Sequence, residues 1–363
     1  MTETTEPTEA SPAALPSGPG SAPSAAGPSD AEPPVEVPPT ATGAPAGTST
    51  GDAGEPAVAG WRPPPAAPIE PGRLRVIVNP SAGGGRAGRM LPEVENALRA
   101  WASEVEVKPT RDIAHADELA LEAAATGRAA VALGGDGLVG RVAGATAEAG
   151  GQLAVLPGGR GNDFARGLGI GRDPVAAAAA LAGFTERRVD LPVANGRAFI
   201  GIASLGFDSD VQVIANKTKF LRGQSVYTYS TMRALLPWRP ARFTVRLDDA
   251  EPREVVGWSV AAANAQYYGG GMRYAPDADI ADGLLEVVFL HRMSRLTLLV
   301  LFRKVFAGSH VKTKHVTVLR ARRLTVDADR PFQVYADGDP VADLPAEIVV
   351  RPGALRLLAP PAG

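Results

Sequence analysis

Three short apolar runs, each followed by a glycine-rich turn, limit the folds open to this chain more than any other feature. The runs cover residues 74–78, 129–133 and 153–156, and each has the length and composition of a buried strand. A further short strand and three helices are expected at residues 105–107, 91–101, 117–125 and 174–181. Strands that alternate with helices form a mostly parallel sheet covered on both faces. We therefore predict an α/β domain over residues 71–188.

After residue 189 the pattern changes to short β-branched or aromatic runs separated by turns. Strands are expected at residues 199–203, 243–247, 255–263, 284–290, 316–319, 323–326 and 332–335. Two segments with helical spacing, 220–236 and 295–306, interrupt these runs. The pattern is typical of a β-sandwich. We predict an all-β sandwich domain over residues 189–363, and the pattern leaves open whether its last strand returns to the first domain.

The first 70 residues differ from the rest in composition. They contain 16 of the 33 prolines and almost no large apolar side chains. Such a segment buries too little surface to offset its chain entropy, so we predict a disordered N-terminal tail. No basic residue precedes Arg62, whereas eight acidic residues do, which leaves 37 basic and 31 acidic residues from Arg62 onward. This mildly basic body suits nucleotides or acidic lipid surfaces and is too weakly charged to indicate a nucleic acid partner.

Composition also excludes several kinds of site. The chain has no cysteine, which excludes disulfides, thiolate metal sites and a cysteine nucleophile. Its four histidines lack the close spacing of zinc ligands. No apolar run reaches the ~18 residues that a membrane span needs, and the N-terminus lacks the pattern of a signal peptide. We expect a cytoplasmic protein without a transmembrane segment.

The strand at 129–133 leads into Gly134-Gly135-Asp136-Gly137. Glycines at the carboxyl end of a strand let a ligand approach the backbone closely. An acid fixed among them suits a Mg²⁺ ion or a hydroxyl group. The alternative is an ordinary strand-to-helix turn in which Asp136 caps the helix.

Two further glycine-rich turns follow the strands at 153–156 and 74–78. The first contains Gly158, Gly159, Arg160 and Gly161, and the second runs from Asn79 to Arg86. Backbone N–H groups and Arg160 in such turns are suited to phosphate oxygens. Because parallel strands end at the same sheet edge, we expect the turns to face one crevice.

The turn after residue 78 also fits a dinucleotide-binding pattern. Gly83, Gly85 and Gly88 have the spacing G-x-G-x-x-G, and Glu106 ends the next strand, where a ribose-binding acid is expected. Against this interpretation, the glycines begin five residues after Val78, and the other two turns stay unexplained.

Taken together, the N-P-S-A-G-G-G, G-G-D-G and G-G-R-G-N-D-F-A-R segments resemble the diacylglycerol kinase catalytic family, which is related to the sphingosine kinases and distantly to the NAD kinases. The similarity continues through Leu205-Gly206-Phe207-Asp208, residues 276–284 and Asp337-Gly338-Asp339. It covers nearly all of the chain after residue 70. The resemblance implies an NAD-kinase-like first domain that binds ATP, a second domain that binds the lipid substrate, and an ATP- and Mg²⁺-dependent lipid kinase.

The resemblance also implies roles for individual residues. Asp339 is the expected proton acceptor, Asp136 lies by the transferred phosphoryl group, and Asp190 belongs to an acidic network at the domain junction. Asp279, Asp282 and the carbonyl of Leu284 resemble the Mg²⁺ loop of bacterial members, and oxygen ligands suit this cation. The alternative for this loop is a hairpin turn. The expected ATP-binding residues are Asn79, Pro80, Ser81, Ala82, Gly83, Thr110, Gly134, Gly135, Asp136, Gly137, Leu138, Gly140 and Arg160.

The sequence departs from the family pattern at four of these positions and at Arg141. Thr, Asn and Glu usually occur where this chain has Leu138, Gly140 and Arg141, Thr is common at Arg160, and the usual D-G-E ends here in Asp339. These changes put nucleotide affinity and rate in question more than the fold. Two other functions therefore stay open, namely an NAD-kinase-like or Rossmann-type soluble enzyme and a non-catalytic nucleotide-binding regulator. A large apolar cleft in the β domain would favour the lipid kinase.

The expected partners are a lipid substrate at a membrane surface and, for a homodimer, a second copy of the chain. The segments 220–238 and 296–306 carry basic residues beside apolar ones, so they suit either a lipid-entry surface or the core. Residues 267–272 line an acyl cleft or form a tight loop. Diacylglycerol is the first expected acceptor, and phosphatidylglycerol, sphingoid bases and polyprenols stay open.

Overall fold

The computed structural model describes residues 61–218, 221 and 224–361. The predicted tail lies outside these residues except for 61–70, which form neither helix nor strand. Ala67 N donates to Gly150 O at 2.9 Å, and Glu70 N donates to Gly127 O at 3.0 Å. The prediction of disorder is therefore wrong for residues 61–70, because their backbone finds hydrogen-bond partners on the body.

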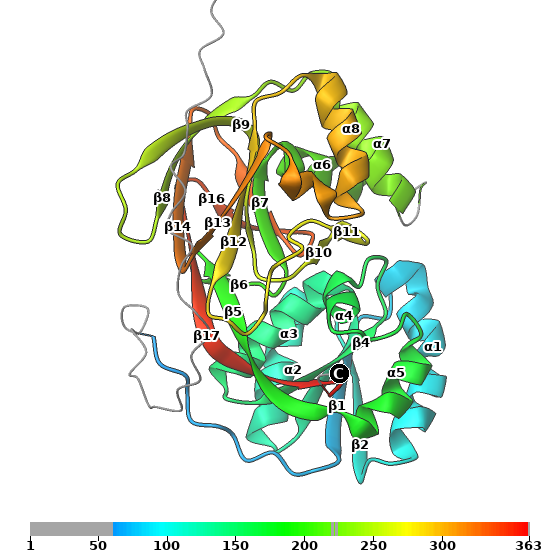
Figure 1. Ribbon diagram of the computed structural model, residues 1–363. Coiled ribbons are helices and arrows are strands. Elements are labelled where there is room, and N and C mark those ends of the chain that lie inside the picture. The colour runs from blue at the N-terminus through cyan, green and yellow to red at the C-terminus, as the bar shows by residue number, and fades with distance from the viewer. Residues whose placement is uncertain (1–60, 219–220, 222–223, 362–363) are drawn as a thin grey trace, which may run out of the picture. The chain divides into compact units, whose positions relative to one another are not determined.

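The first half of the body is a parallel sheet covered by helices (Figure 1). The strands follow the order β2-β1-β3-β4, and the helices α1 and α5 pack on one face while α2 and α3 pack on the other. The strands are β1 (Arg73–Val78), β2 (Glu104–Pro109), β3 (Ala129–Gly134) and β4 (Gln152–Pro157), and the helices are α1 (Ala82–Arg99), α2 (Ile113–Ala125), α3 (Asp136–Glu148), α4 (Asp163–Gly167) and α5 (Pro174–Ala180), followed by the short 3-10 helix η1 (Leu181–Gly183). This arrangement places the carboxyl ends of the four strands at one edge.

The second half is mainly antiparallel, with strand order β16-β15-β7-β9-β8-β14-β17 and with β12 bridging β9 and β13. Its strands are β6 (Arg197–Ala198), β7 (Ile202–Gly206), β8 (Ala241–Leu247), β9 (Arg253–Ala263), β10 (Tyr267–Tyr268), β11 (Met272–Arg273), β12 (Leu285–His291), β13 (Val316–Ala321), β14 (Arg323–Ala328), β15 (Gln333–Ala336) and β16 (Asp339–Asp343). Its helices are α6 (Phe207–Lys217), α7 (Gln224–Leu235), α8 (Arg295–Val305) and η2 (Ser309–Lys312). Trp258, Phe243 and Phe289 are fully buried in a core separate from that of the α/β half.

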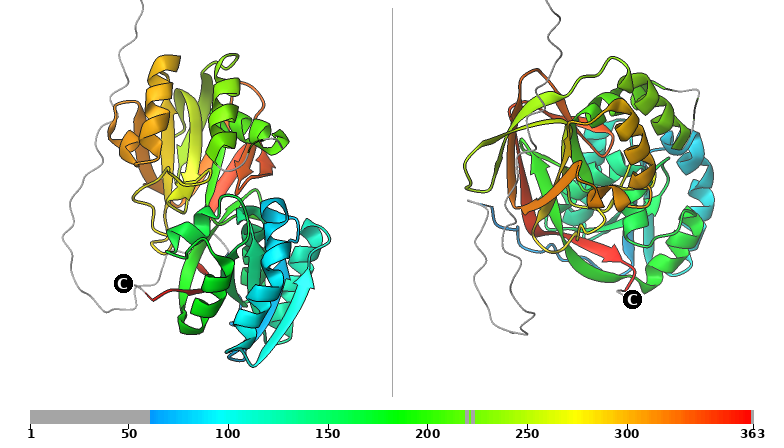
Figure 2. Two further views of the ribbon diagram at one scale, coloured as in Figure 1. Left: turned by 90° about the vertical axis from the view of Figure 1, so that its right-hand side faces the viewer. Right: turned by 45° about the horizontal axis from the view of Figure 1, so that its top comes forward.

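Two long strands join the halves, as the views in Figure 2 also show. The strand β17 (Ala346–Ala359) pairs in parallel with β4 and antiparallel with β5 (Thr185–Ala194) and β14. The predicted domain boundary at residue 188 falls inside β5. Pro352 and Gly353 lie in a bulge between Arg351 and Leu355, and β17 continues through it.

The predicted architecture, an α/β domain followed by a β-sandwich, is confirmed. Several local predictions are wrong. The strand expected at 199–203 lies at Ile202–Gly206, and β5, α6 and β17 were not predicted from the sequence. None of the helices in the described part of the chain combines the length and apolar character needed to cross a bilayer.

Candidate active site

A cleft of about 790 Å³ opens where the glycine-rich turns of the α/β half face the second half. Most of the residues predicted to bind ATP or to act in catalysis line it: Asn79, Pro80, Ser81, Ala82, Gly83, Thr110, Gly135, Asp136, Gly137, Leu138, Arg160 and Asp339. Gly134 and Gly140 lie beneath this surface, and Asp190, Asp279, Asp282 and Leu284 lie outside it. The structure therefore brings the three turns together with Asp136 and Asp339.

The three turns pack so closely that side chains are excluded between them. A methyl group on Gly83, whose φ is +62°, would lie 2.6 Å from the carbonyl oxygen of Gly158, and one on Gly159 would lie 2.3 Å from Cα of Gly135. The first turn is held by Asn79, whose Oδ1 accepts hydrogen bonds from N and Oγ of Ser81 at 3.0 and 2.7 Å. The floor of the cleft is therefore mainly exposed backbone, which suits a phosphate chain.

Asp136 is the first residue of α3, and its side chain does not cap that helix. Its Oδ1 instead accepts a hydrogen bond from Phe164 N at 3.0 Å, at the start of α4. Burial raises the pKa of Asp136 above its ordinary value, although backbone N–H groups of the 162–164 turn oppose this rise. The helix-cap alternative is thus wrong for α3, and Asp136 connects the second and third glycine turns.

Asp163 is a second carboxyl group beside Asp136, and it was not predicted as a site residue from the sequence. Its Oδ2 accepts a hydrogen bond from Gly270 N at 2.7 Å, across the junction of the two halves. Burial and the charge of Asp136 raise the pKa of Asp163 to about 7. A methyl group on Gly161 would lie 3.1 Å from both carboxyl groups, so the glycine keeps the space beside them open. The N-D pair after the third turn was the available signal.

The Asp337-Gly338-Asp339 hairpin lies against the first turns of α3. Asp337, with φ of +52°, accepts hydrogen bonds from Ile200 N at 2.8 Å and Gly201 N at 3.0 Å. Burial and the charge of Asp136 raise the pKa of Asp337 to about 7. The two hydrogen bonds from Ile200 N and Gly201 N show that Asp337 anchors the hairpin. No role had been predicted for this residue from the sequence.

Small residues on α3 make room for this hairpin. A methyl group on Gly137 would lie 2.8 Å from Oδ2 of Asp339, and one on Gly140 would lie 2.7 Å from Oδ2 of Asp337. Gly140, where the family usually has a larger residue, is therefore explained by the approach of Asp337. Burial raises the pKa of Asp339, while the charges of Arg197 and Arg141 oppose the rise.

Two matches to known families follow the same division of the chain. Residues 73–194 match the diacylglycerol kinase catalytic domain, and residues 201–359 match the YegS C-terminal NAD kinase beta sandwich-like domain. A diacylglycerol kinase of Mycobacterium tuberculosis is 35% identical over 301 residues, which are 80% of this chain and 96% of that protein. The chain belongs to the diacylglycerol kinase catalytic family. The resemblance seen in the sequence is thereby confirmed.

Other members of the diacylglycerol kinase family agree with this assignment. A Bacillus subtilis diacylglycerol kinase is 28% identical over 283 residues, which are 76% of this chain and 93% of that protein. The crystal structure of a diacylglycerol kinase from Bacillus anthracis superposes with a TM-score of 0.63 at 20% identity, covering 81% of this chain and 98% of that one. The superposition supports the fold.

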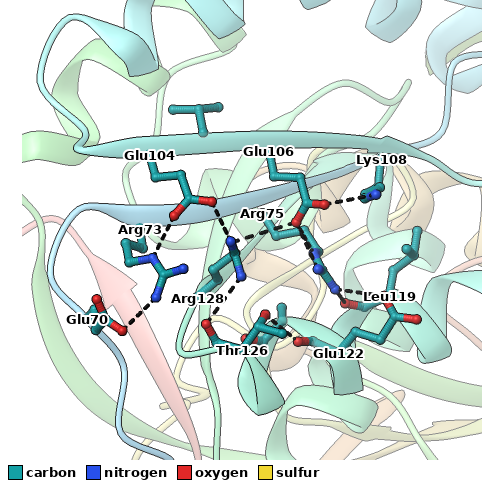
Figure 3. Close-up of polar contacts among 12 residues, drawn as sticks. Glu70, Arg73, Arg75, Glu104, Glu106, Lys108, Leu119, Glu122, Thr126 and Arg128 are labelled. Atoms are coloured by element: carbon teal, nitrogen blue, oxygen red, sulfur yellow. Dashed lines mark hydrogen bonds and ion pairs between the residues drawn. The ribbon is translucent and has the colours of Figure 1, made fainter.

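The dinucleotide-binding alternative fails at its acidic residue. Glu106 does not line the cleft. It forms ion pairs with Arg75 at 2.8 Å and Lys108 at 2.9 Å, as Figure 3 shows. The ion pair with Arg75 joins β1 to β2. The carboxylate of Glu106 therefore has a structural role and does not bind a ribose in the cleft.

Arginines that depart from the family pattern add positive charge to the cleft. Arg160 and Arg141 both line it. Arg141 is held by an ion pair with Asp117 of α2, a half-buried carboxylate whose pKa burial raises. The paired guanidinium is therefore fixed on α3, facing the same cleft as Asp339.

The predicted Mg²⁺ loop lies next to Asp190. The carboxylate of Asp190 accepts hydrogen bonds from Gly283 N at 2.7 Å and Gly353 N at 2.8 Å. Burial raises the pKa of Asp190, and the charges of Asp282 and Asp279 add to this rise. Asp282 also forms an ion pair with Arg320. Within residues 61–218, 221 and 224–361, no group of three or more His, Asp or Glu side chains is arranged to hold a metal ion.

A second, narrow cavity lies inside the β-sandwich half, between its sheet and helices α6, α7 and α8. Its lining is almost entirely apolar and includes Val211, Leu298, Leu301, Phe302 and Val305. Tyr227 lines both this cavity and the cleft. The polar and apolar spaces therefore meet at one side chain.

Proposed function

We propose that the protein transfers the γ-phosphoryl group of ATP to a hydroxyl group of a lipid, with diacylglycerol as the first acceptor to test. The observation that carries this proposal is the meeting of the polar cleft and the apolar cavity at Tyr227. A nucleotide needs the first space and an acyl chain the second. A soluble acceptor such as NAD has no use for an apolar cavity.

ATP would occupy the cleft with its phosphates over the three glycine turns. Backbone N–H groups at the N-terminus of α3 favour negative charge there, and Arg160 and Arg141 add two guanidinium groups. Phosphoryl transfer needs mainly positioning and charge stabilisation. The arginines are therefore suited to compensate for the polar residues that the family usually has at these positions.

The lipid would place its acyl chain in the apolar cavity and its hydroxyl group beside Tyr227. The free volume of the cavity is about 60 Å³, far less than a long acyl chain occupies, so this cavity is not the large apolar cleft that would by itself favour a lipid kinase. Helices α7 and α8, which cover it, would therefore have to move apart when the chain enters. The hydroxyl group would then face Asp136 and Asp339 across the cleft.

Asp339 is the proposed general base. The O–H bond of the acceptor breaks as its oxygen bonds to the γ-phosphorus, the proton passes to the Asp339 carboxylate, and ADP leaves. Burial raises the pKa of Asp339, which makes its carboxylate a stronger base than an exposed one. Such proton removal typically contributes ~10²–10⁴-fold to a rate. Asp136 would orient the hydroxyl group of the acceptor or a Mg²⁺ ion bound together with ATP in the cleft. Asp190 would position the separate loop at residues 279–284 through its hydrogen bonds from Gly283 N and Gly353 N.

Mg²⁺ would be held by Asp279, Asp282 and the carbonyl of Leu284, because carboxylate and carbonyl oxygens suit a hard cation. The nearness of these carboxylates to Asp190 fits such a site, and Mg²⁺ would supply positive charge next to the domain junction. Arg320 competes for Asp282. Arg320→Met should therefore strengthen Mg²⁺ binding, measured as a shift in melting temperature, and Asp282→Asn should abolish that shift.

The test is phosphorylation with radiolabelled ATP of diacylglycerol, a total-lipid extract and NAD, followed by chromatography. Label on a lipid supports the proposal. Label on NAD would identify the soluble-enzyme alternative, and ATP binding without any labelled product would identify a non-catalytic regulator. We expect the activity in the cytoplasm, at the membrane surface where the lipid resides.

Variants of Asp339 separate its role from that of Asp136. Asp339→Ala should abolish transfer and leave ATP affinity within a few-fold, because the base contacts the acceptor. Asp339→Glu should keep part of the activity, since the carboxylate persists ~1.5 Å further out. Asp136→Ala should weaken Mg·ATP binding as well. An equal loss of ATP affinity in both alanine variants would mean that Asp339 is a metal ligand.

A further inference from the structure

Large apolar side chains that face solvent gather on two helices of the described part of the chain. Met232 and Leu236, on and just after α7, are 46% and 76% exposed, and Leu296 and Val300 of α8 are 76% and 59% exposed. The other strongly exposed large apolar residues are Ile113, Leu121 and Val256. Four of seven therefore lie on the α7–α8 pair.

Hydrogen bonds join these two helices into one surface. Arg295, the first residue of α8, donates from Nε to Leu235 O at 3.1 Å and from Nη2 to Leu236 O at 3.0 Å. These contacts place Leu236 next to the start of α8, where Leu296 follows. Figure 1 shows α7 and α8 next to each other on one flank of the second half.

The two segments that carry this surface have basic residues and no acidic ones. Residues 224–240 and 291–315 contain no acidic residue, although the whole chain has more acidic than basic residues. They contain eight basic residues, namely Arg233, Arg239, Arg292, Arg295, Arg303, Lys304, Lys312 and Lys314. Apolar side chains surrounded by basic ones fit a bilayer that contains anionic lipids.

The same helix pair covers the apolar cavity from outside. Leu298, Leu301 and Val305 of α8 are buried and line the cavity, whereas Leu296 and Val300 point away from it into solvent. Thr231 lines the cavity from α7, next in sequence to the exposed Met232. One face of the pair is therefore available to a membrane and the other encloses the proposed acyl site.

We propose that the exposed surface of α7 and α8, formed by Met232, Leu236, Leu296 and Val300, docks on an anionic bilayer, and that the acceptor lipid enters the apolar cavity between these helices. The lipid-entry part rests on the proposed function, whereas the docking part does not. A second copy of the chain is a poor occupant, because a two-fold contact would bring two sets of basic residues together without acidic partners.

Vesicle co-sedimentation of the full chain tests the docking surface. The probes are vesicles of phosphatidylcholine alone and of phosphatidylcholine with a minor share of phosphatidylglycerol. We expect binding to the anionic vesicles that weakens with added salt. The combined substitution Leu236→Ser, Leu296→Ser and Val300→Ser should weaken this binding at least tenfold, and Arg303→Gln with Lys304→Gln should weaken binding to anionic vesicles only.

Leu121→Ser is the matched control, because Leu121 of α2 is also exposed, at 43%, and lies outside the cleft and the cavity. Unchanged vesicle binding in the triple variant would overturn the proposal, and so would an equal loss in the control. A change from dimer to monomer in the triple variant would instead identify a second copy as the occupant.

Activity on a short-chain diacylglycerol in detergent micelles separates this inference from the proposed function. The triple variant should retain that activity and lose activity on vesicles. Vesicle binding by a protein that phosphorylates no lipid in either format would refute the proposed function and the lipid-entry part, and would leave the docking surface supported. Equal activity loss in micelles and vesicles would overturn the entry route.

Discussion

Replacing Gly140 by alanine should destabilise the protein through Asp337. The added methyl group would lie 2.7 Å from Oδ2 of Asp337, whereas ordinary contacts begin at 3.4 Å, so the carboxylate must retreat by about 0.7 Å. Its hydrogen bond from Ile200 N would then lengthen from 2.8 Å to about 3.5 Å, beyond the ~2.7–3.2 Å range of a good bond.

The magnitude follows from opposing effects. A weakened bond to a partly buried carboxylate costs about 1–3 kcal/mol, and overpacking costs about 1–3 kcal/mol. Alanine gains about 1 kcal/mol over glycine inside a helix. We therefore expect a net loss of about 3 kcal/mol, within a range of about 1–5 kcal/mol, in the free energy of unfolding, measured by urea denaturation. Turnover should fall as well, because Asp339 follows Asp337 in the same hairpin.

Two controls make this prediction specific. Gly171→Ala has no atom within 4 Å of the new methyl group and should change stability by less than about 0.5 kcal/mol. In an Asp337→Ala variant the new methyl group at position 140 no longer meets a carboxylate. Adding Gly140→Ala to that variant should therefore leave the free energy of unfolding unchanged or raise it. The same loss in both backgrounds would refute the reasoning.

Three further predictions concern the cleft and the N-terminal segment. Asp136→Asn should fold normally and lose most phosphoryl transfer, and wild-type turnover would remove Asp136 from the mechanism. The pKa of Asp163 is raised from 3.8 to about 7 in the folded protein, so the folded state holds this proton more tightly and stability should fall as pH rises through this interval. Asp163→Asn should raise the melting temperature at mildly alkaline pH and make the melting temperature depend less on pH. A melting temperature that varies with pH as in the wild type would contradict the raised pKa of Asp163. Deleting residues 1–60 should leave the melting temperature unchanged. Deleting residues 1–70 should lower it, because Arg356 loses its hydrogen bond to Ala67 O at 2.9 Å. Equal melting temperatures of the two truncated proteins would show that residues 61–70 do not contribute to stability.

The fold class was readable from the sequence because its signals are local. The strands at β1, β3 and β4 are continuous apolar runs, and glycine turns follow them directly. Strand ends of a parallel sheet share one edge, so the meeting of Asn79, Asp136 and Arg160 in one cleft also followed from the sequence order.

The positions that the sequence did not reveal depend on contacts between distant segments. Asp163 became a site residue only through Gly270, and Asp337 only through Ile200 and Gly201. The reason for Gly140 is likewise a carboxylate almost 200 residues away. The sequence alone determined the fold class and which motifs carry charge. Tertiary packing decided which carboxyl groups lie together, because burial and proximity in space set their pKa values and no local pattern encodes either.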